Sequence, residues 1–234
     1  GVRSDRHSRG FSLLLCCSPL FMTSPLSVLD HAKGDWRAEL RRRRLALSPR
    51  YRRLAAARLP ILAHRWLKPG YTVACYMATG SELDTAPLMA AALARGCRVL
   101  LPRVPRTGRK LRFTALSPQA TWRLNRFGIL ECRGAPVSLT RAQRVFVPLV
   151  GFDRAGRRLG QGGGFYDATL ARFAQRKVRP ALVGVAFSVQ RVDALPAAPW
   201  DVPMDALLTE RGILRPASPA SPPLPCPTKE IPHD

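Results

Sequence analysis

Residues 147–167 combine residue types that suit the binding of a phosphate group. Glycines stand at positions 160, 162, 163 and 164, between an apolar run and a predicted helix that starts near Phe165. Glycine allows the backbone to approach a ligand closely and to adopt positive φ angles. Successive free N–H groups and a helix N-terminus form an anion site, and Arg158 adds a planar, permanently charged donor. The segment therefore predicts phosphate binding.

The spacing of these glycines differs from that of the common phosphate loops. A Walker A loop requires Gly-Lys-Ser/Thr, which this chain lacks. The dinucleotide pattern G-x-G-x-x-G fails because Phe165 stands where its last glycine belongs. A flexible linker is the alternative, but Phe165-Tyr166-Asp167 enters a predicted helix directly after the last glycine. We therefore favour a phosphate site of another type.

Carboxylates are scarce around this segment, which narrows the choice of metal ligands. A nucleoside triphosphate brings Mg²⁺, which proteins hold with one or two carboxylates plus phosphate oxygens and water. Asp167 follows the glycines directly, and Asp201 lies in a second polar segment. These two residues are the candidate magnesium ligands. The alternative for Asp167 is a carboxylate in the first turn of a helix, where the helix dipole stabilises negative charge.

Composition and length limit the classes of protein. The chain has 234 residues, which suits one domain, and 46% of them are hydrophobic, which supports a sizeable core. No apolar run approaches the roughly 20 residues that a membrane helix requires. The six cysteines form no CxxC pair and the four histidines are scattered, so neither a zinc site nor a disulfide framework is expected. We expect reduced thiols and a cytoplasmic protein.

The charge of the chain is strongly positive. Its 38 Lys and Arg residues against 15 Asp and Glu residues give a net charge of +23. Such a chain attracts polyanions, including nucleotides and nucleic acid, although an arginine-rich composition can also reflect coding bias alone. No nucleic-acid recognition motif accompanies the charge. Nucleic-acid binding is therefore the less favoured class, and it predicts steeply salt-dependent binding.

Both ends of the chain differ in composition from its middle. Residues 1–30 contain an arginine-flanked apolar run that superficially resembles a signal peptide, but Cys16-Cys17-Ser18-Pro19 interrupts it and no small-residue cleavage site follows. We expect this segment to lie outside the core, and Met22 is a plausible true start. Residues 215–234 are rich in proline and predict a disordered tail. The predicted folded domain is therefore residues 31–214.

Helical and strand patterns alternate within this domain, which predicts an α/β layered fold with a mostly parallel sheet. Ser48 caps a predicted helix with Pro49 at its first position, and Pro60 is expected to kink or end that helix. Residues 151–164 read as one long polar loop. The other predicted helices are 33–47, 87–95 and 165–175, and the predicted strands are 72–77, 98–101, 111–115, 144–149, 181–187 and 206–209.

The segment Arg158–Asp167 resembles the signature of the 5-formyltetrahydrofolate cyclo-ligase family over ten consecutive positions. Further segments resemble family elements in order and spacing: Lys33 to Leu40, Glu82 to Thr85, Phe127 to Glu131, and Asp201 to Asp205. The resemblance covers about residues 33–211. It implies a single-domain enzyme with a three-layer α/β/α sandwich. The implied reaction converts 5-formyltetrahydrofolate to 5,10-methenyltetrahydrofolate with ATP and Mg²⁺ and releases ADP and phosphate, through phosphorylation of the formyl oxygen and ring closure by N10.

The resemblance also implies roles for single residues. Lys33 and Arg37 bind ATP phosphates, and Asp167 and Asp201 serve Mg²⁺. Glu82, Phe127 and Tyr166 contact the folate. Arg158, Tyr166 and Lys33 are the catalytic residues. The triphosphate is wrapped by one continuous run: Arg158, Leu159, Gly160, Gln161, Gly162, Gly163, Gly164, Phe165 and Tyr166.

The chain departs from the family pattern at a few positions. Cys132 stands where the family usually has proline, and Phe127 where many members have tryptophan. Gln161 and Gly163 occupy positions where some members carry Arg and Lys, so this loop carries less charge. The negative charge of the phosphates would then be offset mainly by Lys33, Arg37 and Arg158.

Two further hypotheses stay open beside the implied one. The first is an enzyme of the same architecture with a different acceptor, which would have no need of both Glu82 and Phe127. The second is a family member that binds folate without turnover. We expect a monomer with no obligate protein partner, and the positive charge would favour a polyglutamylated folate.

Overall fold

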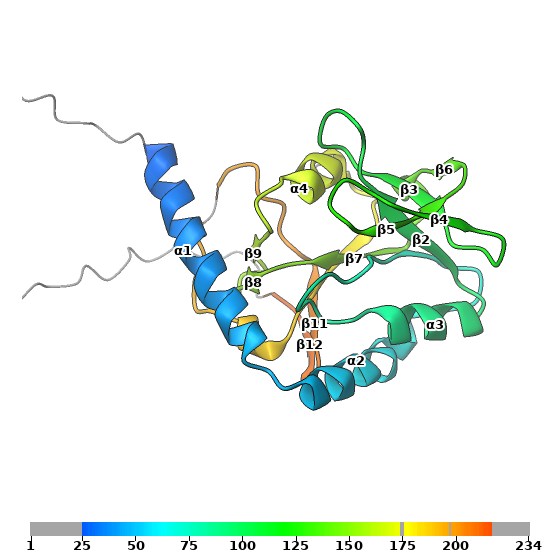
Figure 1. Ribbon diagram of the computed structural model, residues 1–234, viewed down its shortest axis with the longest axis horizontal. Coiled ribbons are helices and arrows are strands. Elements are labelled where there is room, and N and C mark those ends of the chain that lie inside the picture. Colours follow the sequence, from blue (N-terminus) through cyan, green and yellow to red (C-terminus); the bar gives the residue numbers. More distant parts are fainter. Residues whose placement is uncertain (1–24, 174–175, 197, 217–234) are drawn as a thin grey trace, which may run out of the picture.

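The computed structural model describes residues 25–173, 176–196 and 198–216 (Figure 1). Its helices are α1 (Pro25–Leu45), α2 (Pro49–Ala63), α3 (Ala86–Ala94) and α4 (Phe165–Leu170). The strands of its main sheet are β1 (Thr72–Ala74), β2 (Arg98–Arg103), β3 (Arg112–Ala115), β6 (Pro136–Val137), β7 (Arg144–Pro148), β10 (Ala181–Val185), β11 (Ala206–Thr209) and β12 (Gly212–Leu214). Two small hairpins join β4 (Thr121–Leu124) to β5 (Leu130–Arg133) and β8 (Gly151–Phe152) to β9 (Arg158–Leu159).

The main sheet has eight strands in the order β12-β11-β10-β7-β1-β2-β3-β6. The run from β11 through β10, β7 and β1 to β2 is parallel, and β12, β3 and β6 are antiparallel additions at the two sides. From β1 the chain moves to β2 on one side and later returns to β7 on the other. The boundary between β1 and β7 is therefore a topological switch point, where α/β proteins place ligands outside the carboxyl ends of the strands.

Helices cover both faces of this sheet, which gives the predicted three-layer α/β fold. On one face Val73 and Phe146 pack in a cluster with Leu59 of α2 and Leu88 of α3. On the other face the residues that alternate with them pack against Leu170 of α4 and the following turn. Figure 1 shows α2 and α3 below the sheet and α4 above it. Fully burying one such side chain stabilises the fold by about 1.5–3 kcal/mol.

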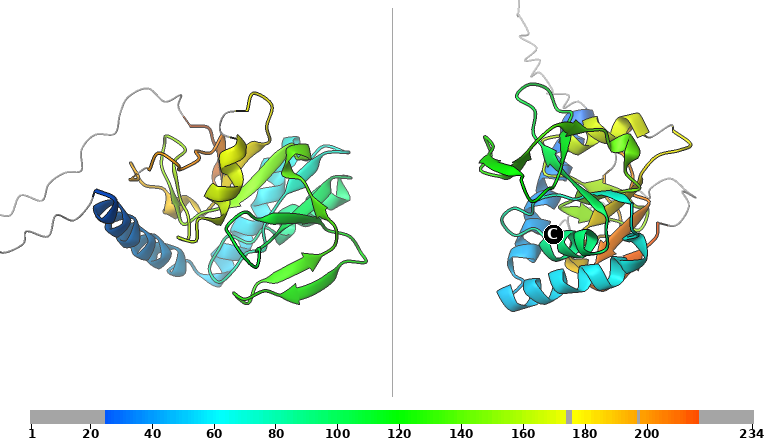
Figure 2. Two further views of the ribbon diagram at one scale, coloured as in Figure 1. Left: turned by 90° about the horizontal axis from the view of Figure 1, so that it is seen from above. Right: turned by 90° about the vertical axis from the view of Figure 1, so that its right-hand side faces the viewer.

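The long helix α1 packs on the β8–β9 hairpin and not on the faces of the sheet. Leu40 of α1 is fully buried in a small cluster with Val150, Leu159 and Val192. In Figure 2 the helix stands apart from α2 and α3, and the β4–β5 hairpin projects from the body of the sheet. Because β8 follows β7 closely, this packing brings α1 to the carboxyl ends of the parallel strands.

The structure corrects three local predictions. Residues 151–164 are not one irregular loop, since they contain the β8–β9 hairpin. At Pro60 the expected end of the helix is wrong, because α2 continues to Ala63, where packing of Leu59 and Ala63 in the core holds its last turn. Strand β2 continues through Pro102, which loses no hydrogen bond to β1 because β1 pairs only as far as Leu100. The predicted cap of α2 is confirmed, with Ser48 Oγ accepting a 3.2 Å bond from the Tyr51 amide.

The domain predicted from the sequence runs from residue 31 to residue 214. Helix α1 begins at Pro25, so the boundary expected at residue 30 falls inside a helix. At the other end β12 finishes at Leu214, next to the expected start of the tail. Residues 1–24 and 217–234 lie outside the described residues. Among the helices that the structure describes, none is both long and apolar enough to cross a membrane.

Candidate active site

A cavity of about 630 Å³ opens at the carboxyl ends of β1, β2 and β7. It is bounded by α1 on one side, by the β4–β5 hairpin on another, and by the glycine-rich segment after β9. Tyr76 follows β1 and Pro148 ends β7, so the cavity lies at the switch point of the sheet. This is the position at which open α/β sheets bind their ligands.

All fifteen residues for which a role was predicted line this single cavity. They come from five separate parts of the chain, which only the fold brings together. They are Lys33, Arg37, Glu82, Phe127, Arg158, Leu159, Gly160, Gln161, Gly162, Gly163, Gly164, Phe165, Tyr166, Asp167 and Asp201.

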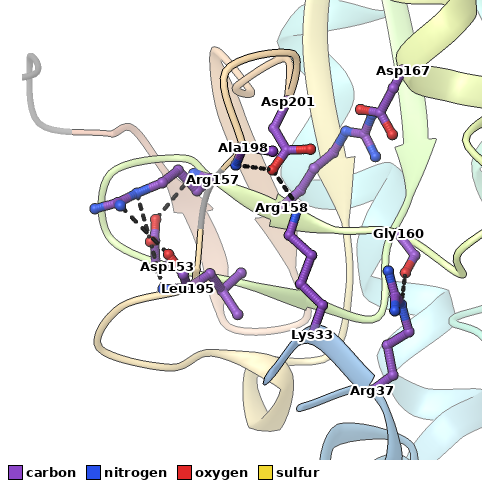
Figure 3. Close-up of polar contacts among 10 residues, drawn as sticks. All are labelled: Lys33, Arg37, Asp153, Arg157, Arg158, Gly160, Asp167, Leu195, Ala198 and Asp201. Carbon is purple, nitrogen blue, oxygen red and sulfur yellow. Dashed lines mark hydrogen bonds and ion pairs between the residues drawn. The ribbon is translucent and has the colours of Figure 1, made fainter. Parts of the chain in front are cut away.

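Two ion pairs join the predicted phosphate ligands to the predicted metal ligands. Lys33 Nζ lies 2.7 Å from Asp201 Oδ2, and their side chains are only 10% and 15% exposed. The guanidinium of Arg158 is paired with Asp167 in the same way, and its side chain is almost completely buried. Figure 3 shows Lys33 reaching from α1 to Asp201 and Arg158 reaching from the hairpin toward Asp167. Each cation therefore has a carboxylate partner that an incoming phosphate would have to replace.

The glycine-rich loop is tied to α1 and to the loop after β1. Arg37 Nε donates a 2.9 Å hydrogen bond to the carbonyl oxygen of Gly160 (Figure 3). Arg41 donates to Oε1 of Gln161 at 2.7 Å, and Gln161 Nε2 donates to Oε1 of Glu82 at 2.9 Å. Gln161 thus links the predicted nucleotide loop to a predicted folate ligand.

Two glycines of the loop adopt backbone conformations that other residues avoid. Gly162 has φ of 105° and Gly164 has φ of 67°. A Cβ atom on Gly164 would lie 3.4 Å from Nη1 of Arg109, which reaches over the loop from the segment before β3. Arg109 lines the cavity as well, and no pattern in the sequence indicated it.

Asp153, for which no role was predicted, organises the hairpin that carries Arg158. Its carboxylate is fully buried and forms an ion pair with Arg157 at 3.0 Å. It also accepts hydrogen bonds from the amides of Arg157 and Leu195 (Figure 3) and from the amide of Ala155. An aspartate followed three residues later by Gly156 is typical of a tight turn, and that spacing could have identified it.

Two buried polar atoms of the cavity have no hydrogen-bond partner among the described residues. They are Nε of Arg158 and the hydroxyl oxygen of Tyr166. Burial, together with the nearby carboxylate of Glu82, raises the pKa of the Tyr166 phenol well above its usual value. Tyr166 therefore stays protonated at neutral pH and can donate a hydrogen bond to a ligand in the cavity.

The carboxylates suit a metal ion only when the ligand supplies further oxygens. No group of three or more His, Cys, Asp or Glu side chains within the described ranges could hold a metal ion by itself. Asp167 and Asp201 nevertheless both line the cavity and offer the hard oxygen donors that Mg²⁺ prefers. Proteins commonly bind Mg²⁺ with one or two carboxylates and substrate phosphates, and the donor set fits that pattern.

Fold and site together define a class of protein: a single-domain α/β enzyme with cations, glycines and carboxylates gathered at its switch point. Comparison with known proteins then gives the family. The sequence profile of the 5-formyltetrahydrofolate cyclo-ligase family matches residues 30–210, so the chain belongs to this family and is an enzyme of it.

Individual relatives agree with this assignment. The 5-formyltetrahydrofolate cyclo-ligase of Escherichia coli strain K12 is 37% identical over 179 residues, which are 73% of this chain and 96% of that protein. The Mus musculus protein of the same name is 28% identical over 193 residues, 78% of this chain and 95% of that one.

Solved structures of related proteins share this fold. The Aquifex aeolicus 5,10-methenyltetrahydrofolate synthetase has a TM-score of 0.66 at 29% identity and covers 85% of this chain and 99% of that chain. The synthetase from Mycoplasma pneumoniae, at 23% identity and a TM-score of 0.61, supports the fold alone.

Proposed function

We propose that this enzyme converts 5-formyltetrahydrofolate to 5,10-methenyltetrahydrofolate, consuming ATP and releasing ADP and phosphate. The observation that carries the proposal is the convergence of Lys33, Arg37 and Arg158 on a glycine-rich loop inside the cavity that also holds Glu82 and Phe127. The relatives that match along nearly their whole length are named for this folate reaction. A cationic loop beside an aromatic and acidic wall suits a triphosphate and a folate bound together.

The triphosphate would bind where the two ion pairs now lie. Phosphate oxygens are good acceptors for the forked donor of Arg158 and for the ammonium of Lys33. Phosphate oxygens would then replace Asp167 and Asp201 as acceptors for the two cations. Both carboxylates would be free to bind Mg²⁺. When bound, Mg²⁺ would offset negative charge on the phosphate oxygens.

The folate would occupy the side of the cavity toward the β4–β5 hairpin. Phe127 there is 55% exposed, and its ring meets that of Phe165 edge-on with centroids 6.0 Å apart. An exposed aromatic ring offers a flat apolar surface to a pterin. Glu82, fixed by the Thr79 amide at 3.0 Å, offers a carboxylate to ring N–H groups.

The chemistry requires an oxygen atom to become a good leaving group. The formyl oxygen attacks the γ-phosphorus of ATP, and the bond from that phosphorus to the ADP oxygen breaks. N10 then attacks the formyl carbon and loses its proton to solvent, and the carbon–oxygen bond breaks to release phosphate. The protein positions the reactants and offsets charge, which is how phosphoryl transfer is generally catalysed. We propose that Lys33, Arg158 and the protonated Tyr166 provide this stabilisation.

The proposal is tested by mixing the protein with ATP, Mg²⁺ and 5-formyltetrahydrofolate and measuring the methenyl product and ADP together. We expect one ADP for each product formed, and no product when Mg²⁺ is chelated. ATP consumption without methenyl formation would instead support the same architecture with a different acceptor. Folate binding without consumption of ATP would support a member that has lost turnover.

A further inference from the structure

One face of α1 contacts both of the loops that border the main cavity. Arg41 follows Arg37 by four positions and Arg44 follows three positions later, so the three side chains share one side of the helix. Arg37 Nε donates a 2.9 Å hydrogen bond to the carbonyl oxygen of Gly160 (Figure 3). Arg41 Nη2 donates to the carbonyl oxygen of Gln161 at 3.4 Å. The glycine-rich loop is therefore attached to α1.

The same helix face also holds the loop after β1. Arg44 Nε donates a 2.8 Å hydrogen bond to Oγ of Ser81, and both residues are buried. Ser81 immediately precedes Glu82, the proposed folate ligand. Within its own loop, Glu82 Oε2 accepts from the amide of Thr79 at 3.0 Å and from the Thr79 hydroxyl at 3.3 Å. We call residues 79–82 the folate loop, and it is attached to α1 as firmly as the glycine-rich loop is.

The side chain of Gln161 joins these two loops at the wall of the main cavity. Its Nε2 donates to Oε1 of Glu82 at 2.9 Å, and its Oε1 accepts from Arg41 at 2.7 Å. The carboxylate at one end and the cation at the other fix which end of the amide is which. A lysine or arginine at this position would have no acceptor for Arg41. We call the series Arg41, Gln161 and Glu82 the amide bridge.

The amide bridge connects the places proposed for two different ligands. The glycine-rich loop would hold the nucleotide phosphates, and Glu82 would hold the folate. A carboxylate oxygen can accept about two hydrogen bonds, so Oε1 of Glu82 can bind a ligand while it accepts from Gln161. A nucleotide that orders the glycine-rich loop would also fix Gln161 and, through it, the carboxylate. The second ligand would then lose less conformational freedom on binding, so each ligand would strengthen the binding of the other.

We propose that Gln161 is a positioning residue that couples nucleotide binding to folate binding through Glu82. This inference rests on the proposed function, because it needs both ligands in the one cavity. The coupling is reciprocal, since the factor by which the nucleotide tightens folate binding equals the factor by which folate tightens nucleotide binding. Both hydrogen bonds of the amide bridge are exposed to solvent, where water competes for them. The factor therefore lies at the low end of the usual range, at about fivefold.

Calorimetric binding of 5-formyltetrahydrofolate, with Mg²⁺ present and with or without saturating ADP, measures this coupling factor. ADP is the nucleotide of choice because it lacks the γ-phosphate that would touch the folate, so the coupling that remains passes through the protein. We expect ADP to tighten folate binding about fivefold in the wild-type protein and less than about twofold in Gln161→Met, which removes both polar atoms of the amide. A factor of one in the wild-type protein, or equal factors in the two proteins, would overturn the proposal.

Two further variants keep the result interpretable. Gln119→Met makes the same change at an exposed glutamine outside the main cavity and should keep the full factor, and loss of coupling there would reject the role of Gln161. Arg41→Met removes the other end of the amide bridge and should also lower the factor, so it serves if Gln161→Met does not fold. Tighter folate binding by Gln161→Met without ADP would mean that Gln161 competes with the folate for Glu82, which would also reject the proposal.

The failure of the proposed function and the failure of this inference give different results. If either 5-formyltetrahydrofolate or ADP does not bind the wild-type protein, the main cavity has been assigned wrongly, and the coupling role of Gln161 is rejected with it. If both ligands bind and the methenyl product forms, but ADP leaves the affinity for folate unchanged, the proposed function stands and this inference alone is rejected.

Discussion

Lys33 and Asp201 form an ion pair between Nζ and Oδ2 at 2.7 Å, although 168 positions separate them in the chain. Lys33 lies on α1, and Asp201 lies in the segment that leads to β11. Asp201 is held from its own side by the amide of Ala198 at 2.8 Å. The pair therefore fixes α1 against the far side of the cavity and places both side chains where a triphosphate would bind.

Lys33→Met should lower both stability and activity. The variant leaves the largely buried Asp201 without its cation, and we expect the unfolding free energy to fall by about 1–2 kcal/mol, less than for a fully buried pair. Because the ammonium is also a proposed phosphate donor, the KM for ATP should rise about tenfold. Urea unfolding and steady-state kinetics measure the two effects.

A double-mutant cycle with Asp201→Asn separates the pair from the individual side chains. We expect coupling between the two substitutions. Strictly additive losses of stability would mean that the pair contributes nothing, and an unchanged KM would remove Lys33 from the nucleotide site.

Asp153→Ala should destabilise the protein more than Lys33→Met does. The substitution leaves three amides and Arg157 without their buried acceptor, at a cost of about 2–4 kcal/mol. Arg158 lies on the same hairpin, so kcat should also fall. Asp193→Ala is the matched control, because Asp193 is exposed, and it should change stability by less than about 0.5 kcal/mol. Equal effects of the two variants would contradict the role given to Asp153.

Gly164→Ala should impair catalysis beyond its effect on folding. Alanine in the left-handed conformation costs about 1–2 kcal/mol, and the new methyl group would lie 3.4 Å from Arg109. Gly70→Ala carries the same strain, at φ of 77°, but meets nothing within 4 Å and lies outside the cavity. We expect similar losses of stability in thermal unfolding and a raised KM for ATP in Gly164→Ala alone. An equal rise of the KM for ATP in Gly70→Ala would indicate that backbone strain causes the effect, and not the position of Gly164 in the glycine-rich loop.

Buried thiols should make the protein less stable at high pH. Burial raises the pKa values of Cys75, Cys97 and Cys132 above that of a free thiol. An unfolded chain releases thiol protons above about pH 8.5, whereas the folded state keeps them. The thiol contribution is therefore complete below pH 8.5 and is lost as pH rises toward the folded pKa values.

The comparison of wild-type protein with Cys75→Ala isolates this contribution from other titrating groups. Between pH 9 and pH 10 the wild-type protein should lose about 1 kcal/mol more unfolding free energy than the variant does. Urea unfolding at the two pH values measures the difference. Parallel losses in both proteins would show that Cys75 ionises equally in the folded and unfolded states.

The sequence predicts the loop of the site because its residues are contiguous. Arg158 and the glycines stand within a few positions of one another, so composition and spacing alone indicate phosphate binding. Lys33 and Glu82 carry no such local pattern, and the family resemblance was needed to find them. Asp153 offered a local signal in its spacing to Gly156, whereas its bond to Leu195, 42 positions away, has no signal in the sequence.

The errors in the fold have two causes. Strands β8 and β9 have two residues each, which is too short for any alternation of polar and apolar residues to show. Pro60 and Pro102 read as local breaks, yet packing in the core and the short partner strand allow both elements to continue. Cytoplasmic location, the monomeric state and the role of each site residue stay predictions.

The most direct test follows the formyl oxygen itself. 5-Formyltetrahydrofolate labelled with a heavy oxygen isotope in its formyl group is converted by the protein with ATP and Mg²⁺, and the released phosphate is analysed by mass spectrometry. If the formyl oxygen attacks the γ-phosphorus in this cavity, each phosphate carries one labelled oxygen. Unlabelled phosphate, or release of methenyl product without phosphate, would contradict the proposed reaction.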